Sequence, residues 1–212
     1  MRIRPAMVKA RRLLALIHGL TGDENSMWVF VRNLKEDYWI IAPRAPYKAE
    51  HPAGGFSWRQ VKTGSPGSQD EAQETSSLED LRPAAEALIA LIDLYGTENN
   101  IPASQFDVIG FSQGGALTNT IALLHPDRIR RVGILASFIP ANAEALLQQQ
   151  PLKGKLFFVA HGRLDEKVKV EYARQSVKML ENAGAQVTFC EDEVGHKVSA
   201  RCLKALEAYF AL

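Results

Sequence analysis

Ser112 lies in the chain's most specific chemical pattern, Gly110-Phe111-Ser112-Gln113-Gly114. The pattern G-x-S-x-G is typical of a nucleophilic serine on a sharp turn from a strand into a helix, where glycines let the two elements pass closely. It also arises by chance in roughly one chain in twenty of this length. The apolar pair Val108-Ile109 before the turn, and a helical pattern that stops at Pro126, favour the chemical interpretation.

A serine hydroxyl becomes a useful nucleophile at neutral pH when a base takes its proton and an acid orients that base. In serine hydrolases built from alternating strands and helices, the acid follows the nucleophile along the chain and the base comes last. His196 lies between the last predicted strand and the last predicted helix, so we expect it to be the base. His125, next to Pro126, is expected at a helix end, whereas His161 as base would need an acid earlier in the chain.

The acid is expected in the loop that begins at His161 and follows the preceding predicted strand. Asp165 and Glu166 both qualify by position, and the spacing leaves the choice between them open. The alternative is that these two carboxylates form a solvated turn or cap the helix that begins near Val168.

The negative charge that develops on a substrate carbonyl oxygen needs preorganised N–H donors. One donor is expected from the backbone of Gln113, directly after the serine, and another from the backbone of Leu20, in the turn after an early strand. A helix that starts behind Ser112 adds the positive end of its dipole. His18 lies in the same turn as Leu20 and is expected to be structural, because His196 already fits the base.

These residues must be positioned by strands and helices that alternate along the chain. Continuous apolar runs suit parallel strands buried on both faces, and they predict strands within 12–19, 38–43, 131–137, 155–162 and 186–190, besides the strand that leads to Ser112. Helical spacing predicts helices at 27–31, up to Tyr95, after Ser112, and at 143–147, 168–183 and 198–210. The fold class is therefore α/β, with a mostly parallel sheet, helices on both faces and a site at the carboxyl ends of the strands.

Residues 44–70 are rich in glycine, proline and serine, and they include the isolated aromatic residues Phe56 and Trp58. Loops this long are usually functional or mobile. Because these aromatic side chains are unfavourable in water, we expect the segment to form the rim of a binding cleft rather than a disordered insertion.

Composition bounds the remaining possibilities. The length and the share of hydrophobic residues fit a single globular domain spanning 1–212, and a formal net charge of +1 argues against nucleic acid or an anionic membrane as the main partner. The N-terminus lacks the apolar segment of a signal peptide, and no apolar run is long enough to span a bilayer. Cys190 and Cys202 show neither a C-x-x-C spacing nor a nearby histidine cluster, so they are predicted to be free thiols. These features predict a cytoplasmic protein that needs no metal or cofactor.

Several further motifs occur in order along the chain: His18-Gly19-Leu20, Gly22-Asp23-Glu24, Gly54-Gly55-Phe56-Ser57-Trp58, the serine motif extended to Gly115, His161-Gly162 with Asp165, and Gly195-His196. With them, nearly the whole chain resembles the phospholipase/carboxylesterase family, which includes acyl-protein thioesterases. The resemblance implies an α/β-hydrolase fold without a large lid domain. It also implies that Ser112 is the nucleophile, Asp165 rather than Glu166 the acid and His196 the base, with the N–H groups of Leu20 and Gln113 as the oxyanion hole.

One departure from the family is visible after the acid. The family usually reads D-x-x-V-P, whereas Asp165 is followed here by Glu166-Lys167-Val168-Lys169. This difference concerns the shape of the loop on the leaving-group side. The early loop Leu20-Thr21-Gly22-Asp23 is more similar to bacterial-type carboxylesterases than to animal thioesterases.

We therefore expect a serine carboxylesterase that acts on a small-molecule ester through an acyl-enzyme. Short to medium acyl chains are the expected substrates, with lysophospholipids and thioesters as further candidates. The pocket is expected to be lined by Leu20, Phe56, Trp58, Phe138, Ile139 and Leu164. The alternatives are a ligand-binding protein without turnover, an acyl-protein thioesterase and a peptidase, and the sequence leaves both a monomer and a homodimer open.

Overall fold

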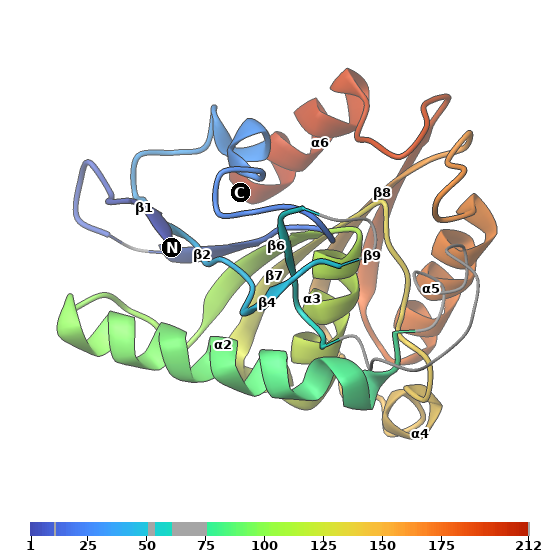
Figure 1. Cartoon of the computed structure of the whole chain (residues 1–212), viewed down its shortest axis with the longest axis horizontal. Coiled ribbons are helices and arrows are strands. Elements are labelled where there is room, and N and C mark those ends of the chain that lie inside the picture. The colour runs from blue at the N-terminus through green and yellow to red at the C-terminus, as the bar shows by residue number, and fades with distance from the viewer. Residues whose placement is uncertain (11, 51–53, 61–75, 212) are drawn as a thin grey trace.

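The centre of the molecule is a sheet of seven strands in the order β1-β3-β2-β6-β7-β8-β9, seen in a computed structural model that describes residues 1–10, 12–50, 54–60 and 76–211 (Figure 1). The strands are β1 (Arg2–Arg4), β2 (Arg12–Ile17), β3 (Tyr38–Ala42), β6 (Phe106–Phe111), β7 (Ile129–Leu135), β8 (Leu156–Gly162) and β9 (Gln186–Asp192). All neighbouring strands run parallel except β1, which pairs antiparallel with β3 at one edge. A separate hairpin-like pair joins β4 (Tyr47–Lys48) to β5 (Phe56–Ser57). The predicted parallel sheet is confirmed, whereas β1, β4 and β5 were not predicted.

Helices cover both faces of the sheet. The helical elements are η1 (Trp28–Val31), α2 (Leu78–Glu98), α3 (Gln113–Leu124), η2 (Pro126–Arg128), α4 (Glu144–Leu147), α5 (Val170–Asn182) and α6 (Ala200–Ala211). Helices α2, α3 and α5 pack on one face, while α6 and η1 pack on the other (Figure 1). The described residues therefore form the predicted layers, with no lid domain among them.

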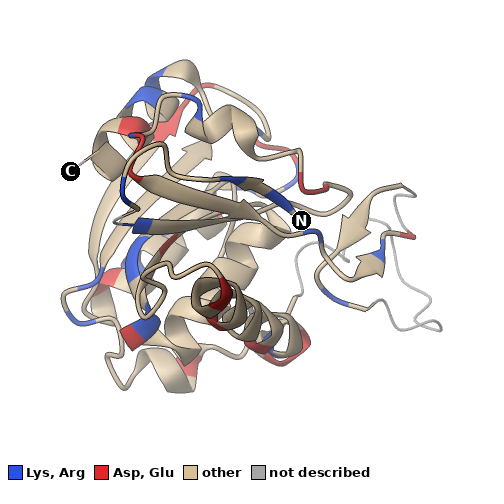
Figure 2. Cartoon of the chain, turned by 90° about the vertical axis from the view of Figure 1, so that its left-hand side faces the viewer, with Lys and Arg blue, Asp and Glu red and all other residues tan. Residues whose placement is uncertain are grey.

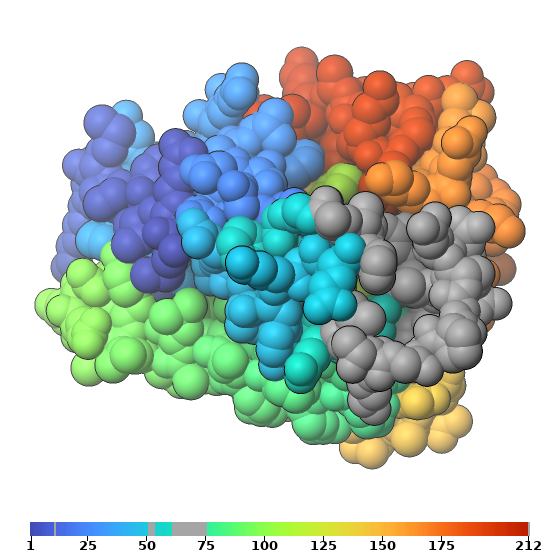
Figure 3. Space-filling view, in the orientation of Figure 1, coloured from blue at the N-terminus to red at the C-terminus, as the bar shows by residue number. Residues whose placement is uncertain are grey.

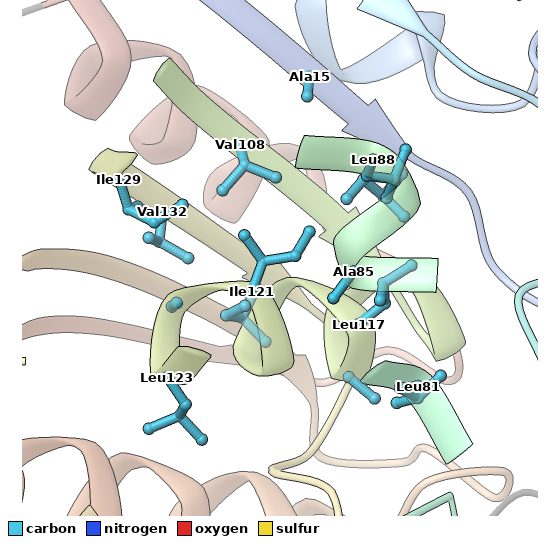
Figure 4. Close-up of a cluster of buried hydrophobic side chains, with 14 of the residues drawn as sticks. Ala15, Leu81, Ala85, Leu88, Val108, Leu117, Ile121, Leu123, Ile129 and Val132 are labelled. Carbon is cyan, nitrogen blue, oxygen red and sulfur yellow. The ribbon is translucent and has the colours of Figure 1, made fainter. Parts of the chain in front are cut away.

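Two apolar cores hold these layers together. On the face of α2 and α3, Leu117 and Ile121 lie against Val108 and Val132 of the sheet (Figure 4). On the opposite face, Leu206 and Phe210 of α6 are among the side chains that pack with the buried residues of the sheet. Because the central strands are buried on both sides, their apolar residues are continuous rather than alternating.

Helix α2 shows how a proline is accommodated. Ser77 caps the helix, because its side chain accepts a hydrogen bond from the N–H of Asp80 and its own N–H donates to the Asp80 carboxylate. Pro83 lies in the second turn, and the helix continues beyond it to Glu98.

The prediction that both cysteines are free thiols is wrong. Cys190 of β9 and Cys202 of α6 form a disulfide, with their Cα atoms 5.8 Å apart. The chain reverses between β9 and α6, and this brings two residues that are distant in sequence within the range that a disulfide spans. Both side chains are buried in the core beneath α6.

The surface carries charges of both signs, interspersed over the helices and loops (Figure 2). This distribution agrees with the small net charge of the sequence. In the part of the chain that the structure describes, no helix is both long and apolar enough to cross a membrane.

Candidate active site

Ser112 occupies the turn between β6 and α3 in a strained backbone conformation, with φ of 52° and ψ of −121°. Such a conformation costs on the order of 1–3 kcal/mol and persists because the surroundings enforce it. A Cβ atom on Gly114 would lie 2.2 Å from the carbonyl oxygen of Ile17, and one on Gly110 would lie 2.2 Å from the carbonyl oxygen of Gly114. The N–H of Ser112 donates to the carbonyl of Leu135 at 2.9 Å. Close backbone packing therefore explains both glycines of the motif.

Three side chains from distant parts of the chain meet at the carboxyl edge of the sheet. The Nε2 atom of His196 lies 3.0 Å from the hydroxyl of Ser112, and its Nδ1 atom lies 2.8 Å from Oδ2 of Asp165. The other carboxylate oxygen of Asp165 accepts the N–H groups of Lys167 and Val168, both at 2.9 Å. Asp165 is thus fixed on both oxygens, and its side chain is fully buried.

The electrostatics of Asp165 define the proton positions of His196. Burial alone would raise the pKa of the Asp165 carboxyl, but the hydrogen bonds from His196, Val168 and Lys167 outweigh it and hold that pKa below its ordinary value. The carboxylate is therefore ionised at neutral pH and can only accept a hydrogen bond. The proton of a neutral His196 then sits on Nδ1, which leaves Nε2 free to accept the proton of Ser112.

The other acid and histidines take different positions. Glu166 is exposed, so the structure brings Asp165 and not Glu166 to His196. His161 is buried against the Val168 carbonyl at 2.8 Å, and burial lowers its pKa. His125 ends helix α3 and pairs with Glu86 at 3.1 Å.

His18 has a structural position beneath the serine turn. Its Nδ1 atom lies 2.7 Å from the Gly19 carbonyl, and its Nε2 atom accepts the N–H of Ala45 at 3.1 Å. Burial, outweighing the bond to Gly19, lowers the pKa of His18, which therefore stays neutral at neutral pH. This histidine braces the turn that carries Leu20.

The backbone around Leu20 lies directly beside the serine turn. A Cβ atom on Gly19 would lie 3.2 Å from Cβ of Ser112. Among the described residues, no acceptor takes a hydrogen bond from the backbone N–H of Leu20 or from that of Gln113, the first residue of α3. The geometry leaves both donors available for an oxyanion next to Ser112.

A cavity of about 640 Å³ opens at Ser112 and His196. Its apolar wall comes mainly from the segment around η1 and from the start of α6, which lie side by side in blue and red in Figure 3. The described lining residues are Gly19, Leu20, Thr21, Gly22, Ser26, Met27, Val29, Phe30, Phe111, Ser112, Lys167, His196, Lys197, Val198 and Leu203. No group of three or more His, Cys, Asp or Glu side chains in the described ranges could hold a metal ion.

Most of the predicted lining residues lie elsewhere, and only Leu20 faces this cavity. Trp58 is buried, and its indole N–H donates to the His18 carbonyl at 2.7 Å. The backbone of Phe56 pairs with Thr21 and Gly22, and its ring lies under the guanidinium of Arg44. These two aromatic residues brace the loop around Leu20 and do not line its cavity.

The remaining predicted lining residues also lie outside this cavity. Phe138 and Ile139 border a second cavity of about 250 Å³, beside α5, and Leu164 is 63% exposed without bordering either cavity. Of the predicted rim at 44–70, residues 51–53 and 61–70 lie outside the described residues. Sequence reasoning missed Val29 and Phe30, whose apolar character in the short predicted helix at 27–31 was the available signal.

Comparisons with known proteins concern the chain as a whole. A model of the phospholipase/carboxylesterase family matches residues 1–212. The chain is 30% identical over 189 residues to a protein of Mycosarcoma maydis named acyl-protein thioesterase 1, covering 82% of this chain and 78% of that protein. It is 28% identical over 123 residues, which are 57% of this chain and 49% of that protein, to a protein of Oryza sativa subsp. japonica named "Probable inactive carboxylesterase".

The structural comparison concerns the fold. The crystal structure of the Bacillus cereus carboxylesterase aligns with a TM-score of 0.81 and 19% sequence identity, covering 99% of this chain and 92% of that chain. The arrangement described above is therefore the α/β-hydrolase fold.

Proposed function

The chain belongs to the phospholipase/carboxylesterase family, and from this premise we propose that it is a serine carboxylesterase with Ser112 as nucleophile, His196 as base and Asp165 as the acid that orients the base. The observation that carries the proposal is the unbroken series of contacts from Ser112 to His196 at 3.0 Å and from His196 to Asp165 at 2.8 Å. That series is the arrangement by which an imidazole activates a hydroxyl.

In the first half of the reaction, the Ser112 oxygen attacks the ester carbonyl carbon while its proton moves to Nε2 of His196. The resulting oxyanion accepts the N–H groups of Leu20 and Gln113. The tetrahedral intermediate then collapses, and the bond between the carbonyl carbon and the leaving oxygen breaks. His196 returns its proton to that oxygen, and an alcohol departs from an acyl-enzyme.

In the second half, water replaces the alcohol. His196 takes one proton from the water, whose oxygen attacks the acyl carbon, and the same two N–H groups stabilise the second oxyanion. The bond to Ser112 breaks, the serine regains the proton from His196, and a carboxylic acid leaves. Asp165 keeps its negative charge throughout and stabilises the imidazolium that forms twice.

Hydrolysis of 4-nitrophenyl butyrate by purified variants tests this proposal. We expect Ser112→Ala to lower kcat on the order of 10⁵-fold, since members of such a triad act as one unit. Ser104→Ala is the matched control, because Ser104 is exposed near the start of β6, the end of that strand opposite Ser112. Retention of more than a hundredth of the wild-type kcat in Ser112→Ala would contradict the proposal.

A thioesterase activity is a second candidate, since one relative is named acyl-protein thioesterase 1. The same acyl-enzyme chemistry applies to a thioester, whose leaving thiolate needs less help from a general acid. Paired substrates with identical acyl chains, one an oxygen ester and the other a thioester, separate the two activities. A ratio of kcat/KM above ten in favour of the thioester would assign the chain to that activity.

A binding protein without turnover is the alternative from another functional class, and one relative carries a name that calls it inactive. The complete contact series of Ser112, His196 and Asp165 argues for turnover here. A fluorophosphonate probe distinguishes the two, because only an activated serine reacts with it. Mass spectrometry should locate the label on Ser112, and an unlabelled protein would favour the binding function.

The cytoplasmic location remains a prediction, and the Cys190–Cys202 disulfide bears on it. Disulfides persist in oxidising compartments and are rare in the cytosol. Rapid alkylation of thiols in intact cells, followed by mass spectrometry, measures the state of the pair. A reduced pair would support the cytoplasm, whereas a fully oxidised pair would contradict it.

A further inference from the structure

The charged residues of the cavity beside Ser112 have one sign. Its described lining contains two lysines, Lys167 and Lys197, and no aspartate or glutamate. Lys197 follows His196 directly, and the backbone N–H of Lys167 binds Asp165. Both lysines therefore belong to the loops that carry the base and the acid.

Neither ammonium group is neutralised by a described partner. Within the described residues, the side chains of Lys167 and Lys197 make no salt bridge and no hydrogen bond. Other exposed cations of the chain do pair, as Arg174 does with Glu191 at 2.6 Å. The two lysines thus remain available to a ligand in the cavity.

The rest of the cavity is apolar or uncharged. Val29, Phe30 and Phe111 contribute apolar surface, and Ser112 borders the same cavity as this surface and the two lysines. A substrate bound with its carbonyl at Ser112 can therefore contact both the apolar surface and the ammonium groups of the same cavity. Lone ammonium groups beside a partly enclosed cavity favour an anion there.

We propose that this cavity selects carboxylic esters that carry an oxyanion group, such as a carboxylate or a phosphate, which Lys167 and Lys197 bind. The inference rests on the proposed function and names the substrate class of the same site. Because the lysines lie at an exposed rim, each contributes a modest preference that salt screens.

The test compares matched esters of equal acyl length. 4-Nitrophenyl hydrogen adipate carries a carboxylate at the end of its acyl chain, whereas 4-nitrophenyl hexanoate is neutral, and Ser112→Ala supplies the background rate. The measured quantity is the ratio of kcat/KM for the anionic ester to that for the neutral ester. 1-Butyrylglycerol 3-phosphate against 1-butyrylglycerol gives the corresponding ratio for a phosphate on the leaving group.

We expect Lys167→Gln and Lys197→Gln each to lower at least one of these ratios roughly threefold, and the double variant to lower it roughly tenfold, as for exposed ion pairs. The ratio should fall in wild type at 1 M salt. Lys169→Gln is the matched control, because Lys169 is exposed, two residues from Lys167, and does not border the cavity. Its ratios should equal those of wild type.

Two outcomes separate the substrate class from the proposed function. Ser112-dependent turnover of the neutral ester with both ratios unchanged in the double variant would overturn the role of the lysines and leave the esterase intact. If the neutral ester is not hydrolysed, calorimetric binding of monoethyl adipate to Ser112→Ala still decides the matter. Weakened binding after the two lysine substitutions would support the proposal, and unchanged or absent binding would overturn it.

Discussion

Ser112 and His196 lie 3.0 Å apart, yet the two regions that carry them are built differently. The turn of Ser112 is held by backbone packed on backbone, so that a Cβ atom on Gly114 would lie 2.2 Å from the Ile17 carbonyl oxygen. In the loop of His196, a Cβ atom on Gly195 would meet nothing nearer than the Leu164 carbonyl oxygen, at 3.7 Å. The backbone of the His196 loop is closely packed at one point, since a Cβ atom on Gly162 would lie 2.1 Å from the Val194 carbonyl oxygen. The glycine of the serine turn is therefore tightly enclosed, whereas Gly195, next to His196, has room.

Around His196 itself, the loop is held by a few specific bonds. The disulfide between Cys190 and Cys202 joins the two ends of the segment that contains His196. Within it, Val194 accepts the N–H of Leu164 at 3.1 Å, and His196 binds Asp165. The difference teaches that the proposed nucleophile is fixed by steric exclusion on its own turn, while the ring of the proposed base is oriented by individual interactions that single substitutions can remove.

Asp165→Asn removes the interaction that orients His196, and of the substitutions around His196 it is expected to have the largest effect on activity. The amide oxygen can still accept the N–H groups of Lys167 and Val168, which turns the amide NH₂ toward His196. His196 must then accept at Nδ1 and carry its proton on Nε2, where it cannot take the proton of Ser112. We expect kcat to fall roughly 10³–10⁴-fold with little change in thermal stability.

Glu166→Gln is the control for this substitution, because Glu166 is the adjacent exposed acid. Steady-state hydrolysis of a 4-nitrophenyl ester and a thermal unfolding curve provide the two measurements. A kcat of Asp165→Asn within tenfold of wild type would show that the base does not depend on this carboxylate.

A pair of glycine substitutions compares the packing of the two regions. Gly114→Ala forces a methyl group against the backbone of Ile17, so we expect a loss of roughly 3 kcal/mol in the free energy of unfolding. That loss corresponds to a Tm about 6–12 °C lower for a chain of this size. Gly195→Ala, with space for its methyl group, should stay within roughly 0.5 kcal/mol. Equal Tm shifts in the two variants would remove the contrast.

The sequence predicted well which distant residues meet at the carboxyl edge of the sheet, and it predicted poorly which residues line the cavity. The meeting of Ser112 and His196 could be predicted because each is marked by its local pattern and its place between a strand and a helix. The choice of Asp165 over Glu166 could not be made from spacing, since it depends on which carboxylate receives the N–H groups of Lys167 and Val168.

Contacts between distant segments account for the remaining differences. Val29 and Phe30 border the cavity because the segment around η1 packs beside α6, an approach that no local pattern encodes. Trp58 was expected to line the pocket because a fully exposed indole is unfavourable in water. The fold instead buries it against the His18 carbonyl. Cys190 and Cys202 show no disulfide signal in sequence, and only the reversal from β9 into α6 brings them together.

Removing the disulfide should affect the histidine region more than the serine region. In Cys190→Ala/Cys202→Ala we expect roughly 3 kcal/mol lower stability, because the cross-link no longer restricts the unfolded chain. We expect kcat to fall several-fold as His196 loses its anchored ends, while KM for a neutral ester changes little. Dithiothreitol should reproduce the loss in wild type and leave the double variant unaffected. A double variant with wild-type kcat would show that the loop positions His196 without the cross-link.

The smallest expected effect concerns the buried histidines beneath the two regions, His18 on the serine side and His161 on the acid side. Burial lowers the pKa of each below 6.5, so the folded state binds fewer protons than the unfolded state as pH falls through that value. Stability should therefore decrease from pH 7.5 to pH 5.5, by at most about 1.4 kcal/mol per pH unit for each histidine. Asp165 contributes nothing in this window, because its lowered pKa affects stability only as pH falls below about 3.8.

Urea unfolding at the two pH values measures this slope in wild type and in His18→Gln and His161→Gln. Each substitution removes one titrating group, so each should flatten the slope. The two variants need not be equal, because both ring nitrogens of His18 have partners, whereas Nδ1 of His161 has none among the described residues. If only His161→Gln flattened the slope, the loss of stability at low pH would arise in the region of Asp165 and His196. That region and the serine turn would then differ in their response to protonation as well as in their packing.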